Sequence, residues 1–143
     1  MPQVVVDFLK ATGQKRVDKT DIGAIARLIY EGIAFKCRYA IETLEEISGE
    51  QIDTVHVIGG ASGVPILNEM IASALGREVA AGPREATCIG NSLLQAVGTG
   101  ELRGAQEIRE VVRSNFDTQT VQPREPENWN ARYAQFRAVC GLK

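Results

Sequence analysis

The chain has 143 residues, of which 44% are hydrophobic and 24% are charged, and these values predict one soluble globular domain with a core of its own. The formal net charge of -2 gives no electrostatic basis for binding nucleic acid or an anionic membrane surface. No run of residues approaches a transmembrane span, no secretory signal is visible, and the three widely separated cysteines lack metal-ligand spacing, so we expect a cytoplasmic protein with reduced, mostly buried thiols.

Two helices are predicted in the first third of the chain. Residues 2–11 form a short one, and a cap at Thr20 or Asp21 begins a long one that runs to about Ser48, with Gly49 behind it. At 1.5 Å per residue the long helix measures about 40 Å, so we expect it to pack against something larger. Its apolar residues form a continuous stripe, which predicts a well-covered helix: Ile22, Ile25, Ile29, Ile33, Cys37, Ile41, Leu44 and Ile47.

A glycine-rich turn connects a strand to a helix in the middle of the chain. The β-branched run 55–58 predicts a buried strand, and Pro65 has the fixed φ of a first helical position, so we expect a helix from there to about residue 75. Gly59 and Gly60 permit backbone conformations that are closed to residues with a Cβ. Several backbone N–H groups should converge at the positive end of the helix dipole, which predicts an anion site with phosphate as its usual ligand.

The remaining elements are mostly helical. We predict a strand over 78–80, helices over 85–97 and 105–114, an extended segment over 116–121 and a last helix over 127–140. Aromatic and apolar residues at helical spacing in the last helix favour core packing over a cofactor site: Trp129, Tyr133, Phe136 and Val139. Because two strands do not form an independently stable sheet, either the sheet continues outside this chain or a strand is unrecognised.

The glycine turn alone leaves its ligand open. A Rossmann-like dinucleotide module begins with a similar turn, but too few strands follow to build a doubly wound sheet. A P-loop is excluded because no Lys-Ser/Thr pair follows the glycines. A tight turn without any ligand is an equal alternative on this motif alone.

Three polar residues near the turn are assigned structural roles. His56 is the only histidine and has no evident acid or nucleophile partner, so we expect it to be exposed or structural. Ser62 is expected to cap the helix at Pro65, and Asn68 to serve packing or a domain interface. The chain is therefore assigned no catalytic residue and no metal ligand.

Further segments extend the pattern beyond the turn. They are residues 29–39, 52–62, 67–70, 81–87 and 89–91. Together they resemble the C-terminal domain of the FGGY carbohydrate kinases, and most closely the rhamnulokinase branch of that family. The similarity covers most of the chain in the right order, which makes it far more specific than a lone glycine turn.

The resemblance implies an α/β fold that is part of an actin- and hexokinase-like ATPase, a C-terminal lobe of few strands with several packed helices. ATP with Mg²⁺ lies between two lobes in that family. The resemblance implies that Gly59, Gly60 and Ala61 approach the phosphates and adenosine. Val64 stands where the family commonly has an asparagine near adenine, and a valine side chain can pack on the base but cannot hydrogen-bond to it.

The resemblance also implies that the aspartate base and the sugar-binding lobe of such a kinase lie upstream of the matched part. Residues 1–143 are therefore expected to be a C-terminal nucleotide-binding lobe that binds ATP or ADP. We expect that it does not phosphorylate a ketose such as L-rhamnulose by itself, since phosphoryl transfer depends on positioning by both lobes. The alternative is a non-catalytic remnant that forms a homo-oligomer through its uncovered face.

Overall fold

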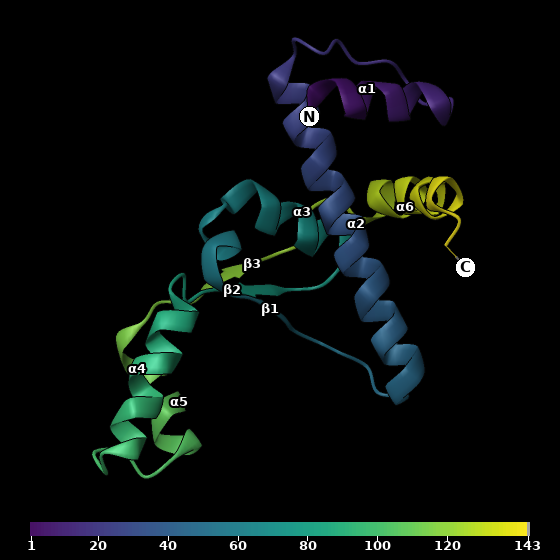
Figure 1. Cartoon of the computed structure of the whole chain (residues 1–143). Helices are drawn as coiled ribbons and strands as arrows, with labels where there is room; N and C mark the ends of the chain where they lie inside the picture. The colour runs from purple at the N-terminus through teal and green to yellow at the C-terminus, as the bar shows by residue number, and fades with distance from the viewer. Residues whose placement is uncertain (143) are drawn as a thin grey trace.

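The computed structural model describes residues 1–142, which form six α-helices, one 3-10 helix and three short strands (Figure 1). In chain order the elements are α1 (Pro2–Ala11), α2 (Ile22–Ser48), β1 (Val55–Val57), η1 (Gly59–Gly63), α3 (Pro65–Leu75), β2 (Val79–Ala81), α4 (Ala86–Gly98), α5 (Ala105–Asn115), β3 (Gln119–Val121) and α6 (Pro126–Cys140). The Asp21 side chain accepts a hydrogen bond from the Ala24 N–H and so caps α2. Gly49 and Gly76 end α2 and α3 in the left-handed conformation, as predicted from their positions.

The three strands form one mixed sheet in the order β1-β2-β3. β1 and β2 are parallel, with His56 opposite Ala80, whereas β2 and β3 are antiparallel, with Ala80 opposite Thr120. Helix α3 is the crossover between the two parallel strands, so β1, α3 and β2 make a βαβ unit. β3 lies in the segment predicted only as extended, and it is the strand that sequence reasoning did not recognise. The expected α/β class, with few strands and several packed helices, is confirmed.

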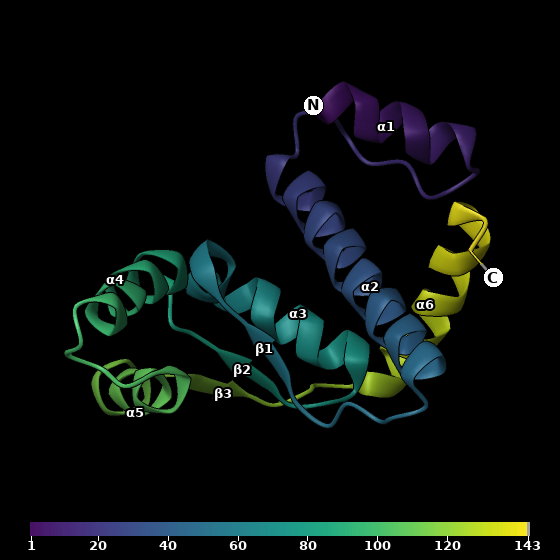
Figure 2. The same ribbon diagram turned by 60° about the horizontal axis from the view of Figure 1, so that its bottom comes forward.

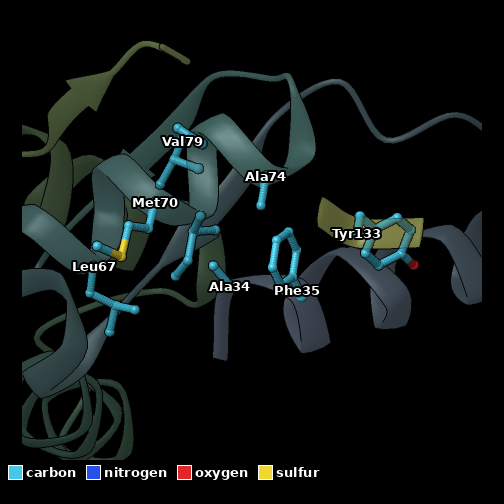
Figure 3. Close-up of a cluster of buried hydrophobic side chains, with 9 residues drawn as sticks. Ala34, Phe35, Leu67, Met70, Ala74, Val79 and Tyr133 are labelled. Carbon is cyan, nitrogen blue, oxygen red and sulfur yellow. The ribbon is translucent and has the colours of Figure 1, made fainter. Parts of the chain in front are cut away.

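Helix α3 is the centre of the core, because seven of its eleven residues are buried. It packs against α2, α6 and the sheet. Figure 3 shows Phe35 of α2 between Ala74 of α3 and Tyr133 of α6. The Phe35 ring also lies 5.3 Å from that of Trp129 and 5.4 Å from that of Phe136, between centroids. The aromatic residues of α6 therefore serve core packing, as predicted.

The prediction that α2 is well covered is wrong for much of its length. Ile22, Leu44 and Ile47 are 62%, 53% and 78% exposed. The 27 residues of α2 span about 40 Å, whereas the 11 residues of α3 span about 16 Å. α3 can therefore cover only the part of α2 around Ala34 and Phe35, which are buried. Although α2 is long, no helix within residues 1–142 combines the length and the apolar character needed to cross a bilayer.

Polar contacts fix α6 against α2 and α3. Arg38 of α2 donates to the Ala74 carbonyl oxygen at 2.9 Å and to Asn130 Oδ1 at 2.6 Å. The Tyr133 hydroxyl donates to Glu42 Oε2 at 2.6 Å. Burial and the Glu42 carboxylate raise the pKa of Tyr133, so this hydroxyl remains a donor at neutral pH.

Helices α4 and α5 form a hairpin that stands apart from the core. Neither helix has a buried residue in the part of the chain that the structure describes. Both views place the hairpin at the opposite end of the molecule from α1 and α6 (Figures 1 and 2). The expectation of mostly buried thiols is wrong, and for Cys88 the sparse packing of this hairpin is the reason. Cys88 in α4 and Cys140 at the end of α6 are exposed, and Cys37 in α2 is half-buried.

Candidate functional site

The turn after β1 has the conformation that its glycines predict. Ile58 is extended, and Gly59 then takes a φ of +73°, which L side chains rarely adopt. The chain continues as the 3-10 helix η1, and Pro65 begins α3 directly after Val64. The strand-turn-helix order expected from the sequence is therefore present.

Side-chain hydrogen bonds hold η1 against the start of α3. The Ser62 Oγ donates to the Gly59 carbonyl oxygen at 2.8 Å, and Asn68 Nδ2 donates to the Ser62 carbonyl oxygen at 2.9 Å. Ser62 is not the cap of α3, because the cap position is Val64 and no side chain caps it. Asn68 is 2% exposed, and its Oδ1 has no hydrogen-bond partner among the described residues. Asn68 thus has a definite role in shaping the turn, which its sequence position did not reveal.

The chain after β2 returns to the same edge of the sheet as the glycine turn, because the carboxyl ends of parallel strands lie together. The Gly82 N–H donates to the Val57 carbonyl oxygen at 2.9 Å, and the Gly59 N–H donates to the Pro83 carbonyl oxygen at 3.1 Å. The two turns are therefore joined by backbone hydrogen bonds. The Gly59 N–H, which was expected to face an anion, is already used in this contact.

The four residues predicted to bind a nucleotide lie together on η1 and at its end. Gly60 and Ala61 are exposed, and Gly59 and Val64 are half-buried. A Cβ placed on Gly59 or on Gly60 would meet no atom within 4 Å, so the surface over both glycines is open. Val64 packs partly against the hydrophobic core, which leaves only part of its side chain for a ligand.

Arg84 lies on the glycine turn and was not among the predicted site residues. An ideal Cβ at Gly63 would lie 2.7 Å from Nε and 2.9 Å from Cζ of Arg84. Figure 2 shows the segment between β1 and α3 beside α4, and Arg84 precedes the first residue of α4, Ala86, by two positions. The position of Arg84 could have been inferred by pairing the two predicted strands in parallel. That pairing places the residues after each strand side by side.

Two cavities among the described residues lie away from this turn. One of about 410 Å³ lies between α1, α2 and α6, and one of about 280 Å³ lies among residues of α2, α3 and α6 and the segment before α6. Neither is lined by Gly59, Gly60, Ala61 or Val64. Among residues 1–142 no three His, Cys, Asp or Glu side chains are grouped to hold a metal ion. The candidate site is therefore an open surface at the sheet edge.

Comparison with known proteins gives one family. A family model of the FGGY family of carbohydrate kinases, C-terminal domain, matches residues 8–99. The chain is 36% identical over 137 residues to a rhamnulokinase of Bacteroides thetaiotaomicron, an alignment that covers 96% of this chain and 28% of the relative. It is 33% identical over 138 residues to a rhamnulokinase of Ligilactobacillus salivarius, covering 95% of this chain and 28% of the relative. For a rhamnulokinase of Bacillus subtilis the identity is 34% over 125 residues, covering 87% and 25%. The chain thus spans about a quarter of the length of the curated relatives that it matches.

Proposed function

Because the chain belongs to the FGGY family of carbohydrate kinases, whose C-terminal domain it contains, we propose that its glycine turn binds ATP or ADP. The observation that carries the proposal is the open turn Gly59–Gly63 at the carboxyl ends of two parallel strands, inside the residues that the family model matches. Ligands of α/β sheets bind at that edge. The six helices and small mixed sheet are consistent with part of an actin- and hexokinase-like fold.

In this proposal the backbone of Gly59, Gly60 and Ala61 approaches the phosphates and the ribose, because the open surface there admits a bulky anion. Val64 offers the exposed part of an apolar side chain to the adenine base. ATP supplies the phosphoryl group that is transferred, and the residues of this chain bind and orient the nucleotide. We assign Mg²⁺ no ligand here, since residues 1–142 contain no group of carboxylates or imidazoles arranged for a metal.

For the activity of the whole kinase, we propose ATP-dependent phosphorylation of a hydroxyl group on a ketose such as L-rhamnulose. The support is that several relatives are named rhamnulokinase. We further propose that this chain alone does not phosphorylate the sugar. Phosphoryl transfer requires groups positioned around both the phosphate and the acceptor, and the chain spans about a quarter of those relatives. Turnover of L-rhamnulose by the isolated chain would contradict this.

Nucleotide titration tests the proposal. A free ADP concentration of about 100 times the dissociation constant should raise the free energy of unfolding by about 2.7 kcal/mol. Gly60→Ala should weaken ADP binding, because the new methyl group occupies the open surface, and should leave the fold intact, because no atom lies within 4 Å. Gly98→Ala at the far end of α4 is the matched control, since its Cβ also meets no atom within 4 Å. Unchanged ADP affinity in Gly60→Ala would place the nucleotide elsewhere.

A second candidate function is a non-catalytic module that self-associates. The exposed apolar side chains of α2, among them Ile22 and Ile47, favour it. A chain that oligomerises and shows no response to ADP or ATP would support this candidate over the nucleotide-binding lobe. The Rossmann-like alternative gains no support, because the sheet formed by the described residues has a single parallel pair next to an antiparallel strand.

A further inference from the structure

We propose that Arg84 binds the phosphate chain of the nucleotide at the glycine turn, an inference that rests on the proposed function. The segment that carries Arg84 lies close to both ends of the turn. At one end, the Pro83 carbonyl oxygen accepts a hydrogen bond from the Gly59 N–H at 3.1 Å. At the other end, the Arg84 side chain lies against Gly63. Residues 83 and 84 therefore span the turn from its first glycine to its last.

The missing side chain at Gly63 is what allows this placement. A Cβ there would lie 2.7 Å from Nε and 2.9 Å from Cζ of Arg84, which is closer than real Cβ contacts come, and 3.1 Å from Cδ, which is tighter than most of them. At Gly59 and Gly60 the same test meets no atom. The guanidinium group therefore covers only the end of the turn and leaves the surface over the first two glycines open.

The charge of Arg84 is available to a ligand. Arg27, Arg38, Arg77, Arg103, Arg124 and Arg132 form ion pairs with glutamates. Arg84 forms none with any described residue, including its exposed neighbour Glu85, and it makes no side-chain hydrogen bond there. A guanidinium group presents a planar fork of donors that matches the oxygens of a phosphate. An unpaired fork beside an open glycine turn fits the phosphate chain of a nucleoside di- or triphosphate better than it fits the uncharged nucleoside.

The test compares ADP with adenosine by calorimetric titration at low and constant ionic strength, because salt screens an exposed charge. Arg84→Gln should weaken ADP binding about tenfold to hundredfold and leave adenosine binding unchanged, since only the charged ligand loses hydrogen bonds to the guanidinium. Arg84→Lys should recover part of the ADP affinity, because it restores the charge without the fork. Arg109→Gln, an exposed arginine of α5, is the matched control and should bind both ligands as the wild type does.

A second variant tests the same contact without removing the charge. Gly63→Ala should displace the flexible Arg84 side chain and weaken ADP binding in the same direction, while the melting temperature of the free protein stays close to that of the wild type. Suppose that the wild type binds ADP more tightly than adenosine and that Arg84→Gln binds ADP as tightly as the wild type does. Arg84 then does not bind the phosphates, and the proposed nucleotide site remains. If the wild type binds neither ligand, the proposed function fails and the role of Arg84 fails with it.

Discussion

Gly82 lies where the turn after β2 comes close to the backbone that leads into β3. It is buried, takes a φ of +126° and donates its N–H to the Val57 carbonyl oxygen. A Cβ at this position would lie 2.7 Å from the backbone oxygen of Asp117 and 3.4 Å from Cα of Thr118. Both contacts are with backbone in the segment leading to β3, which cannot move away as a side chain end can. Only glycine therefore satisfies this position.

We predict that Gly82→Ala lowers the free energy of unfolding by about 2–4 kcal/mol, because backbone strain and overpacking add at one residue. Urea unfolding followed by circular dichroism measures this. Gly60→Ala is the control within the same site and should change stability by no more than about 0.5 kcal/mol, since its Cβ meets no atom within 4 Å. Equal stabilities of the two variants would show that the Asp117 backbone does not approach Gly82 this closely in solution.

At the residue scale, local chemistry is what the sequence reveals best. Paired glycines after a β-branched run predict the turn, and Gly59 has the positive φ that such a turn needs. Arg84 and Asn68 were missed as parts of the turn. Arg84 lies against Gly63, which is distant in sequence, and Asn68 donates to a backbone oxygen, which carries no sequence signal. Their roles follow only from the pairing of β1 with β2 and from the packing of α3.

A polar cluster joins the C-terminal part of α2 to two loops. One loop leads into β1, and the other follows α3. Arg77 donates to both oxygens of Glu45, at 2.5 Å and 3.1 Å, and to the Ile52 carbonyl oxygen at 2.7 Å. The Ile52 N–H donates to Glu45 Oε1 at 2.7 Å. The Arg77 guanidinium, and then the Ile52 N–H, hold the pKa of Glu45 below its ordinary value of 4.5. This cluster fixes the loop that leads into β1.

We predict that Glu45 makes stability depend on pH on the acid side. Because the folded pKa is lowered, its contribution is fully present above the unfolded value of 4.5 and is lost as the pH falls through the folded pKa below 4.5. The free energy of unfolding of the wild type should exceed that of Glu45→Gln by a constant amount above about pH 5.5, and the difference should shrink below about pH 4.5. Urea unfolding across this range measures both curves. Glu46→Gln is the exposed neighbouring control, and a difference that stays constant into acid would contradict the prediction.

At the element scale, the helices were predicted well because their ends carry local signals. Asp21, Gly49, Pro65 and Gly76 mark the limits of α2 and α3 as the sequence predicts. The short strand β3 carries no such signal, since Gln119 and Thr120 are exposed and polar and its pairing with β2 is non-local. The cover of α2 was also mispredicted, because periodicity shows which face is apolar and not how long a partner lies against it.

At the scale of the whole molecule, apolar surface is distributed unevenly. The core lies around α3, whereas Ile22, Ile33, Leu44 and Ile47 of α2 are between 41% and 78% exposed. Their spacings of eleven, eleven and three residues place all four on one side of a helix, because eleven residues make about three turns. α2 therefore presents an uncovered apolar stripe. Water contact with such a stripe is unfavourable, by about 25 cal/mol for each Å² of apolar surface.

We predict that the isolated chain self-associates through this stripe. Multi-angle light scattering after size-exclusion chromatography should give a mass above that of one chain, decreasing on dilution. A variant with Ile33→Gln, Leu44→Gln and Ile47→Gln should shift toward the monomer while its melting temperature changes little, because the substituted side chains are largely exposed. Leu94→Gln in α4 is the control, since Leu94 is 63% exposed but lies outside the stripe. A wild type that is monomeric at every concentration would show that the stripe does not drive association. If only Leu94→Gln converts the oligomer to a monomer, the contact between chains lies on α4.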